Sequence, residues 1–274
     1  MNRKKIASFA LNSGLILIAL TALTPVLWMV SASLMKSGEA GTFPPPFLPK
    51  NPTLEHYRAL TERLNMVRYF FNSFVIASAV TIISLLLNSM AGFAFAKYHF
   101  KGKDKLFKIL LSGMVIPAQV TLLPLFLMLK TFGVVNTYVG AIIPGMASIF
   151  GIFLIRQFVM SIPDSLIEAA RIDGGSEFRI YRTIILPLCK PILFTLALFT
   201  FMGTWNDFMW PLVIMTDESN YTLPVGLANL MGEHVLDLEL MMAGSVITII
   251  PVLILFLVFQ RHYVRGIMVG GVKE

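Results

Sequence analysis

The residue types that most often catalyse reactions or bind metals are few in this 274-residue chain and far apart. The histidines stand singly and there is one cysteine: His56, His99, His234, His262 and Cys189. No H-E-x-x-H or G-x-S-x-G motif occurs, and Gly102-Lys103 is followed by Asp104 instead of the Ser or Thr of a phosphate-binding loop. We therefore expect no active site and no metal site in this chain, and we interpret Cys189 as a packing residue.

The most specific spacing of polar and small residues lies between positions 161 and 187. Ser161 fits the N-cap of a short helix, which the Gly174-Gly175 pair is expected to end near Ile172 because glycine tolerates positive φ. Ser176 fits the cap of a second helix. The expected apolar stripe of that second helix is Phe178, Tyr181, Ile184 and Ile185. The segment therefore predicts a helix, a glycine turn and another helix.

The exposed face of this segment indicates docking more than reaction chemistry. A short amphipathic helix can simply lie on lipid, where bulky apolar side chains are preferred. Ala169 and Ala170 beside Glu168 fit that role poorly, because small side chains next to a charge permit the close approach of another protein.

The elements that must position this segment follow from composition. Hydrophobic residues make up 56% of the chain and charged residues 14%, against about 25% charged residues in an ordinary soluble chain. This excludes a soluble domain and a disordered chain, and the lone cysteine excludes a disulfide-stapled fold. The composition predicts an integral membrane protein.

Long runs without Asp, Glu, Lys or Arg indicate membrane-spanning helices of about 20 residues each. They are too long, and alternate too little, for strands of a barrel. The sequence therefore predicts an all-α, polytopic fold, a six-transmembrane-helix bundle forming one domain over residues 1–274. The expected spans are about 8–33, 70–95, 109–129, 133–155, 186–207 and 240–260.

Charge predicts the orientation of these spans. The N-terminus, the 97–108 and 156–190 loops and the C-terminal tail together carry 16 Lys and Arg residues, whereas the alternate loops carry 6. Because positive residues favour the cytoplasmic side, both termini are expected there, and the acidic 207–239 segment is expected outside. The net charge of +7 is then a result of topology and of contact with anionic lipid, not a sign of nucleic-acid binding.

Several polar side chains lie within or at the ends of the expected spans: Asn72, Asn88, Gln119, Asn136 and Asn206. Hydrogen bonding between helices is their ordinary role, and a place on a transport pathway is the alternative. Ionisable residues are missing from the span interiors. This argues against proton-coupled or ion-coupled transport.

Within residues 161–187 the chain resembles a known protein family. The residues that carry the resemblance are Glu168, Ala169, Ala170, Gly174, Ile184, Leu186 and Pro187. Their spacing is similar to that of the EAA loop of ABC importer permeases at every motif position. In that family the loop forms a coupling helix that docks in a groove of the cytoplasmic ATPase.

Other stretches resemble the carbohydrate-uptake branch of the family, specifically the second permease of maltose-type importers. They are PPPFLPKNPTLEHYRAL at 44–60, WNDFMWPLVIM at 205–215, YTLPVGLA at 221–228 and the tail FQRHYVRGIMVGGVKE at 259–274. The resemblance implies a type I importer-like permease fold and a non-catalytic subunit that forms half of a sugar pathway in the cell membrane.

The resemblance also implies partners. These are a second permease subunit in a heterodimer, two copies of a cytoplasmic ABC ATPase that binds ATP-Mg, and an extracellular sugar-binding protein, with no cofactor on this chain. A polyol or glycerol phosphate importer, an ion-coupled secondary transporter and a membrane scaffold are the alternatives. The particular sugar is left open.

Aromatic and amide groups near the expected outer end of the fifth span are candidates for the substrate path or for contact with the binding protein. They are Trp205, Asn206, Trp210 and Tyr221. Aromatic rings and an amide can stack on and hydrogen-bond a sugar, but Trp and Tyr are also typical of the interfacial belt of a membrane protein.

Overall fold

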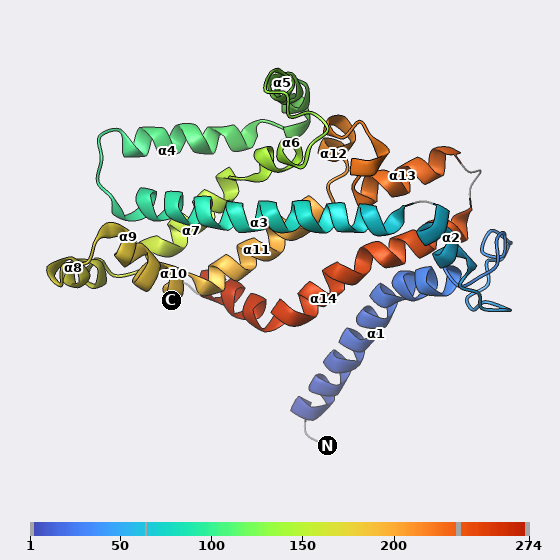
Figure 1. The fold of residues 1–274 in the computed structure, drawn as a ribbon. Coiled ribbons are helices and arrows are strands. Elements are labelled where there is room, and N and C mark those ends of the chain that lie inside the picture. Colours follow the sequence, from blue (N-terminus) through green and yellow to red (C-terminus); the bar gives the residue numbers. More distant parts are fainter. Residues whose placement is uncertain (1–2, 64, 234–236, 272–274) are drawn as a thin grey trace. The chain divides into compact units, whose positions relative to one another are not determined.

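The computed structural model describes residues 3–63, 65–233 and 237–271, and this part of the chain is helical without strands (Figure 1). The expected all-α fold is confirmed. His234 and the outermost residues of both termini lie outside the described residues.

The α-helices within the described residues are α1 (Arg3–Ala32), α2 (Glu55–Arg63), α3 (Met66–Lys97), α4 (Lys103–Ser112), α5 (Ala118–Thr131), α6 (Tyr138–Ile142), α7 (Ile149–Met160), α8 (Asp164–Ile172), α9 (Glu177–Ile180), α10 (Leu186–Leu188), α11 (Lys190–Trp205), α12 (Met209–Ile214), α13 (Leu223–Glu233) and α14 (Leu238–Gly271). Short 3-10 helices cover Gly113–Val115, Ile143–Gly145 and Glu218–Asn220, and Tyr181–Ile185 is a π-helix.

Three helices in the described residues are long and apolar enough to cross a membrane: Leu11–Ala32, Met66–Lys97 and Leu238–Val258. Three further pairs of helices pass the same test when each bent pair counts as one span, so up to six spans are present by length and composition. The ranges of the six expected spans and the single domain stay predictions.

The third expected span, 109–129, is two helices instead of one. Lys103–Val115 and Ala118–Thr131 meet at 105°. Pro117 lies at the break, and Ile116 before it is extended, as a residue preceding proline prefers. The fourth and fifth expected spans are also bent, by 43° after Gly145 and by 79° before Lys190.

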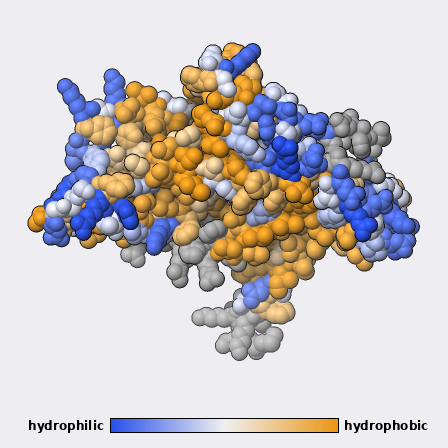
Figure 2. Space-filling view, viewed as in Figure 1, coloured by the Kyte–Doolittle hydropathy of each residue, from blue (hydrophilic) through white to orange (hydrophobic). Residues whose placement is uncertain are grey.

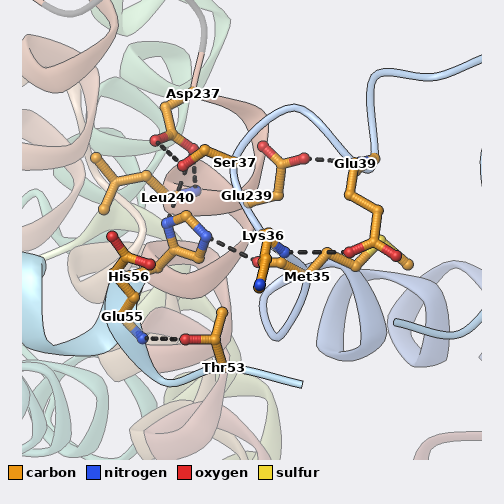
Figure 3. Close-up of polar contacts among 11 residues, drawn as sticks. Met35, Lys36, Ser37, Glu39, Thr53, Glu55, His56, Asp237, Glu239 and Leu240 are labelled. Carbon is orange, nitrogen blue, oxygen red and sulfur yellow. Dashed lines mark hydrogen bonds and ion pairs between the residues drawn. The ribbon is translucent and has the colours of Figure 1, made fainter. Parts of the chain in front are cut away.

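By its internal contacts the chain divides into two compact units, residues 1–67 with 226–250 and residues 68–225 with 251–274. In the first unit, a buried and a half-buried carboxylate lie between the start of α14 and the segment after α1 (Figure 3). Glu239 is 1% exposed and accepts a hydrogen bond from the Ala40 amide at 2.6 Å. The buried His56 of α2 hydrogen-bonds the Met35 carbonyl at 2.8 Å, and its other ring nitrogen lies 3.8 Å from Asp237.

In the second unit, α3 is the helix against which the others pack. Its buried side chains belong to apolar clusters that include residues of α7, α8, α11 and α12. The cluster nearest the end of α3 contains Phe93, Ile155, Val159, Ile162, Ile167, Ile180, Tyr181, Ile185, Cys189, Ile192 and Leu196. The buried Cys189 fits its interpretation as a packing residue.

The outer surfaces of the long helices are apolar. Large hydrophobic side chains such as Ile18, Ile82 and Leu123 are each more than 60% exposed. Figure 2 shows hydrophobic side chains over the helices of the second unit and hydrophilic ones over the α8–α9 end. Exposed apolar surface of this extent is typical of a protein whose helices face lipid.

Candidate functional site

The candidate site is the turn between α8 and α9, which closes as a Schellman motif. The Gly175 amide donates to the Ala170 carbonyl at 2.9 Å and the Gly174 amide donates to Arg171 at 3.0 Å. Gly174 has φ +75°, a conformation that side chains with a Cβ rarely adopt. The expected end of the helix at Ile172 and the glycine reversal are confirmed.

The N-terminus of α9 has a side-chain cap, whereas that of α8 has none. Ser176 caps α9 as predicted, because its hydroxyl accepts a hydrogen bond from the Arg179 amide. The predicted cap at Ser161 is wrong. Ser161 follows the last turn of α7 and donates to the Phe158 carbonyl at 2.7 Å, so α8 begins after Pro163 without a side-chain cap.

The apolar stripe of the second helix also differs from the prediction. Tyr181 and Ile185 are buried and Ile184 is half-buried, but Phe178 is 63% exposed. Ile180, which the stripe omitted, is 1% exposed. The π-helix at Tyr181–Ile185 shifts the helical repeat, so that residues five apart share a buried face.

The face of α8 that carries the motif is open. Glu168 and Ala169 are exposed, while Ala170 is half-buried against the core cluster and Ile167 on the opposite side is 2% exposed. Ile172 at the end of the helix is 86% exposed. A helix with one buried anchor and an exposed face of small, acidic and apolar residues is suited to docking against a protein.

The remaining motif residues lie where the second helix leads into α11. Ile184 and Leu186 are half-buried and pack on the core cluster, and Pro187 is exposed. The structure therefore gathers the seven motif residues along one continuous segment, with Glu168 and Ala169 at its exposed end.

Two side chains that the sequence analysis did not single out connect α8 to α9 across the turn. Arg171 donates to both carboxylate oxygens of Glu177, at 2.7 and 3.2 Å. This hydrogen bond lowers the pKa of Glu177 below its usual value. Burial, followed by the hydrogen bond to Glu177 and its negative charge, raises the pKa of Tyr98 to about 12. Opposite charges on either side of a glycine turn are the sequence signal that indicates such a pair.

A third contact attaches the start of α8 to the end of α3. Lys97 is 7% exposed, and its Nζ donates to Asp164 at 2.6 Å and to the Ile162 carbonyl at 2.5 Å. The pKa of Asp164 is lowered, mainly by the hydrogen bond from Lys97. Nothing in the local sequence around Lys97 indicates a partner 67 residues away.

The four candidate residues for substrate contact do not form one group. Trp205 is fully buried, with its ring centroid 5.4 Å from that of Phe70 and 5.8 Å from that of Phe201. Asn206 is exposed at the end of α11.

Trp210 and Tyr221 do share one apolar cluster. The Trp210 indole donates to the Gly140 carbonyl at 3.2 Å, and the Tyr221 carbonyl accepts from Asn72 at 2.9 Å. In this conformation the two tryptophans are core residues. A role for any of the four in substrate contact stays a prediction.

The described residues hold no cluster of His, Cys, Asp and Glu that fits a metal ion. The α8–α9 segment presents an exposed acidic and apolar face on a scaffold of apolar helices, of which up to six spans are long enough to cross a membrane. This arrangement is that of a membrane protein with the short helix α8 outside its spans.

The chain belongs to the family of binding-protein-dependent transport system inner membrane components, whose model matches residues 88–269. It is 38% identical, over the full length of both chains, to the arabinooligosaccharides transport system permease protein AraQ of Halalkalibacterium halodurans. It is 35% identical to the trehalose/maltose transport system permease protein MalG of Thermococcus litoralis, covering all of this chain and 99% of that one.

Among solved structures, the chain matches a subunit of a bacterial ABC transporter involved in the import of the acidic polysaccharide alginate. The TM-score is 0.83 at 25% identity, and the match covers 96% of this chain and 99% of the other. The resemblance to ABC importer permeases that the sequence indicated is confirmed.

Proposed function

We propose that this chain is a transmembrane permease subunit of an ATP-driven carbohydrate importer and forms half of its translocation pathway. The observation that carries this function is the exposed α8 face, with Glu168 and Ala169 outward and Ile167 buried behind them. The family, and relatives named for oligosaccharide and disaccharide transport, support the same conclusion.

In this function α8 is the coupling helix, and Glu168, Ala169, Ala170 and Gly174 are its contact and turn residues. Ile184, Leu186 and Pro187 continue the coupling segment into α11. An ATPase groove with a basic group opposite Glu168 and an apolar wall opposite Ile172 would cover the exposed face. ATP-Mg is bound by that partner, and closure of two ATPase copies moves α8.

The remaining assembly follows from the same proposal. A second, different permease supplies the other half of the pathway, and an external sugar-binding protein delivers substrate to the loops opposite α8. Both termini and the α8–α9 turn then lie on the cytoplasmic side of the cell membrane, where the 16 basic residues of the sequence gather. The lack of ionisable residues in the interiors of the expected spans argues against an ion-coupled secondary transporter.

The test of coupling uses substitutions at the turn. In Gly174→Asp the positive φ costs at most about 1–2 kcal/mol, and in Ala170→Phe the added bulk displaces α8 where Ala170 packs on the core cluster. We expect both variants to insert in the membrane at normal levels but to lose ATP-dependent sugar uptake and co-purification of the ATPase.

Gly133→Asp is the matched control. Gly133 also has positive φ, +68°, and also follows a helix, but it lies outside the coupling segment. Uptake in this variant should follow its expression level. Normal uptake and normal ATPase association in Gly174→Asp would show that the turn has no coupling role.

The substrate class is tested on the binding protein encoded with this permease. Calorimetric titration with arabinooligosaccharides, maltose, trehalose and glycerol 3-phosphate should give tight binding of one of the sugars. Tight binding of glycerol 3-phosphate alone would instead assign the importer to polyol phosphates.

A further inference from the structure

Helix α3 contacts a segment that is distant in the sequence at each of its two ends. At one end lies the α8–α9 turn, and at the other lies the segment of residues 216–223, which follows α12 (Figure 1). Its 32 residues span about 48 Å at 1.5 Å per residue, more than the roughly 30 Å hydrocarbon core of a bilayer.

The contacts at the α8 end are polar and partly buried. Lys97 donates to the Ile162 carbonyl and to Asp164, just before and at the start of α8. The Phe93 ring stacks on Tyr181, whose hydroxyl is 2.7 Å from the Ser89 hydroxyl. A displacement of α8 must therefore either break these contacts or carry the end of α3 with it.

The middle of α3 packs too closely on its neighbours to slide past them. A Cβ at Gly92 would lie 2.6 Å from Ile155 of α7. The buried Asn88 accepts a hydrogen bond from the Ser148 amide at 3.0 Å, at the start of the same helix. Contacts this close leave little space for α3 to slide along α7.

The contacts at the far end are again polar and buried. Asn72 is 1% exposed and donates to the Ser219 and Tyr221 carbonyls at 3.0 and 2.9 Å. Next to it, the Ser73 hydroxyl accepts from the Leu223 amide at 2.7 Å. Segment 216–223 is thus attached by its backbone to the first turns of α3.

We propose that α3 transmits the movement of α8 to segment 216–223, with Lys97 and Asn72 as the positioning residues at its two ends. The inference rests on the proposed function, because it takes α8 as the coupling helix. The proposal adds α3 as a route for the movement, beside α7 and α11, which precede and follow the α8–α9 segment in the sequence. The polar contacts at both ends of α3 make it a continuous packed element that a displacement at either end would move.

The experiment measures how accessible segment 216–223 is to a thiol reagent in two nucleotide states of the ATPase. Glu218→Cys places an exposed thiol in segment 216–223. The unsubstituted chain, whose native Cys189 is buried, gives the background labelling. The complex of this chain with its co-expressed permease and ATPase is labelled with a membrane-impermeant maleimide. Labelling rates are compared without nucleotide and after trapping with ATP and orthovanadate.

We expect trapping to change the labelling rate, and the change to be lost in Lys97→Met with the nucleotide-free rate unaltered. Lys101→Met is the matched control, since Lys101 is an exposed lysine four residues further on and should leave the change intact. A trapping response in Lys97→Met equal to that of Lys101→Met would overturn the inference.

A second variant, near the start of α3, distinguishes loss of transmission from a folding defect in Lys97→Met. Asn72→Ala, whose contacts lie at the opposite end of α3, should lose the same response. A full trapping response in Asn72→Ala would contradict transmission through α3.

The two proposals fail in distinguishable ways. A response that survives in Gly174→Asp would overturn the proposed coupling role of α8, and this inference with it. A response that is lost in Gly174→Asp but survives in Lys97→Met and in Asn72→Ala would overturn the role of α3 alone.

Discussion

Arg171 and Glu177 form a doubly hydrogen-bonded ion pair across the Gly174 turn, which joins the last turn of α8 to the first turn of α9. The backbone of the turn sets the direction of the chain, and the ion pair restricts the angle between the two helices. The turn and the ion pair therefore both favour the same orientation of α8 relative to α9.

The ion pair should contribute modestly to closure of the turn, because both side chains are nearly half exposed, at 43% and 47%. In a double-mutant cycle of Arg171→Ala and Glu177→Ala we expect a coupling free energy of about 0.2–1 kcal/mol. The Gly175 amide is hydrogen-bonded to the Ala170 carbonyl when the turn is closed. The rate of its hydrogen exchange therefore measures this coupling free energy. A control cycle of Arg179→Ala with Glu177→Ala should show no coupling, because residues two apart on a helix do not face each other.

Tyr98 should ionise later than ordinary tyrosines, since its pKa is raised from 10.0 to about 12. A folded-state pKa raised in this way gives stability that is complete below pH 10 and is lost as the pH rises towards 12. At pH 11, Tyr98→Phe should therefore leave the tyrosinate absorbance at 295 nm unchanged.

Glu177→Gln provides the contrast for that titration. It removes a negative charge from beside Tyr98, so absorbance at pH 11 should increase, and adding Tyr98→Phe should abolish the increase. A drop in absorbance for Tyr98→Phe alone would show that its phenol is not shifted.

Two glycines inside helices should respond in opposite ways to the same substitution. Gly92→Ala places a Cβ 2.6 Å from Ile155 and should lower stability by about 1–3 kcal/mol. Gly203→Ala in α11 meets nothing within 4 Å and should be neutral or stabilising, by up to about 1 kcal/mol, because alanine favours helix. Thermal unfolding of the detergent-solubilised complex checks the pair, and equal effects would refute close packing of α3 on α7.

Glu239 should keep the segment that follows α1 attached to the start of α14. Glu239→Ala leaves the Ala40 amide without its carboxylate acceptor, a loss of about 1.5–3 kcal/mol. We expect tryptic cleavage after Lys50 to become about tenfold faster or more. Glu62→Ala, which changes an exposed glutamate of α2, is the control and should not alter the cleavage rate.

Much of the docking segment was predictable because its determinants are local. Gly174, Ser176 and the end of α8 at Ile172 depend on backbone conformation and on hydrogen bonds between near neighbours. The error at Ser161 arose because the same residue types suit the end of one helix and the start of the next. Phe178, in the first turn of α9, is exposed although Tyr181 is buried, and the π-helix that follows lets Ile180 share the buried face with Ile185 instead.

The attachments of this segment were not predictable, because they join residues far apart in sequence. The lysine at position 97 meets an aspartate 67 residues later, and Asn72 meets carbonyls about 150 residues later. Two of the polar residues expected within the spans, Asn72 and Asn88, do form hydrogen bonds to distant segments, whereas Asn206 bonds the Met202 carbonyl of its own helix. Several of the distant partners are backbone groups, which have no signature in the sequence, and the hydroxyls of Tyr138 and Ser148 complete the set.

The sequence by itself determined that the chain is apolar and helical, and it located the EAA-like segment, because hydropathy and turn chemistry act over a few residues. Only the tertiary structure decided that Glu168 is exposed and Trp205 buried, and that α3 connects the α8 turn to segment 216–223. The physical reason is that burial and long-range hydrogen bonds arise when helices pack, and packing depends on the shape of both surfaces at once.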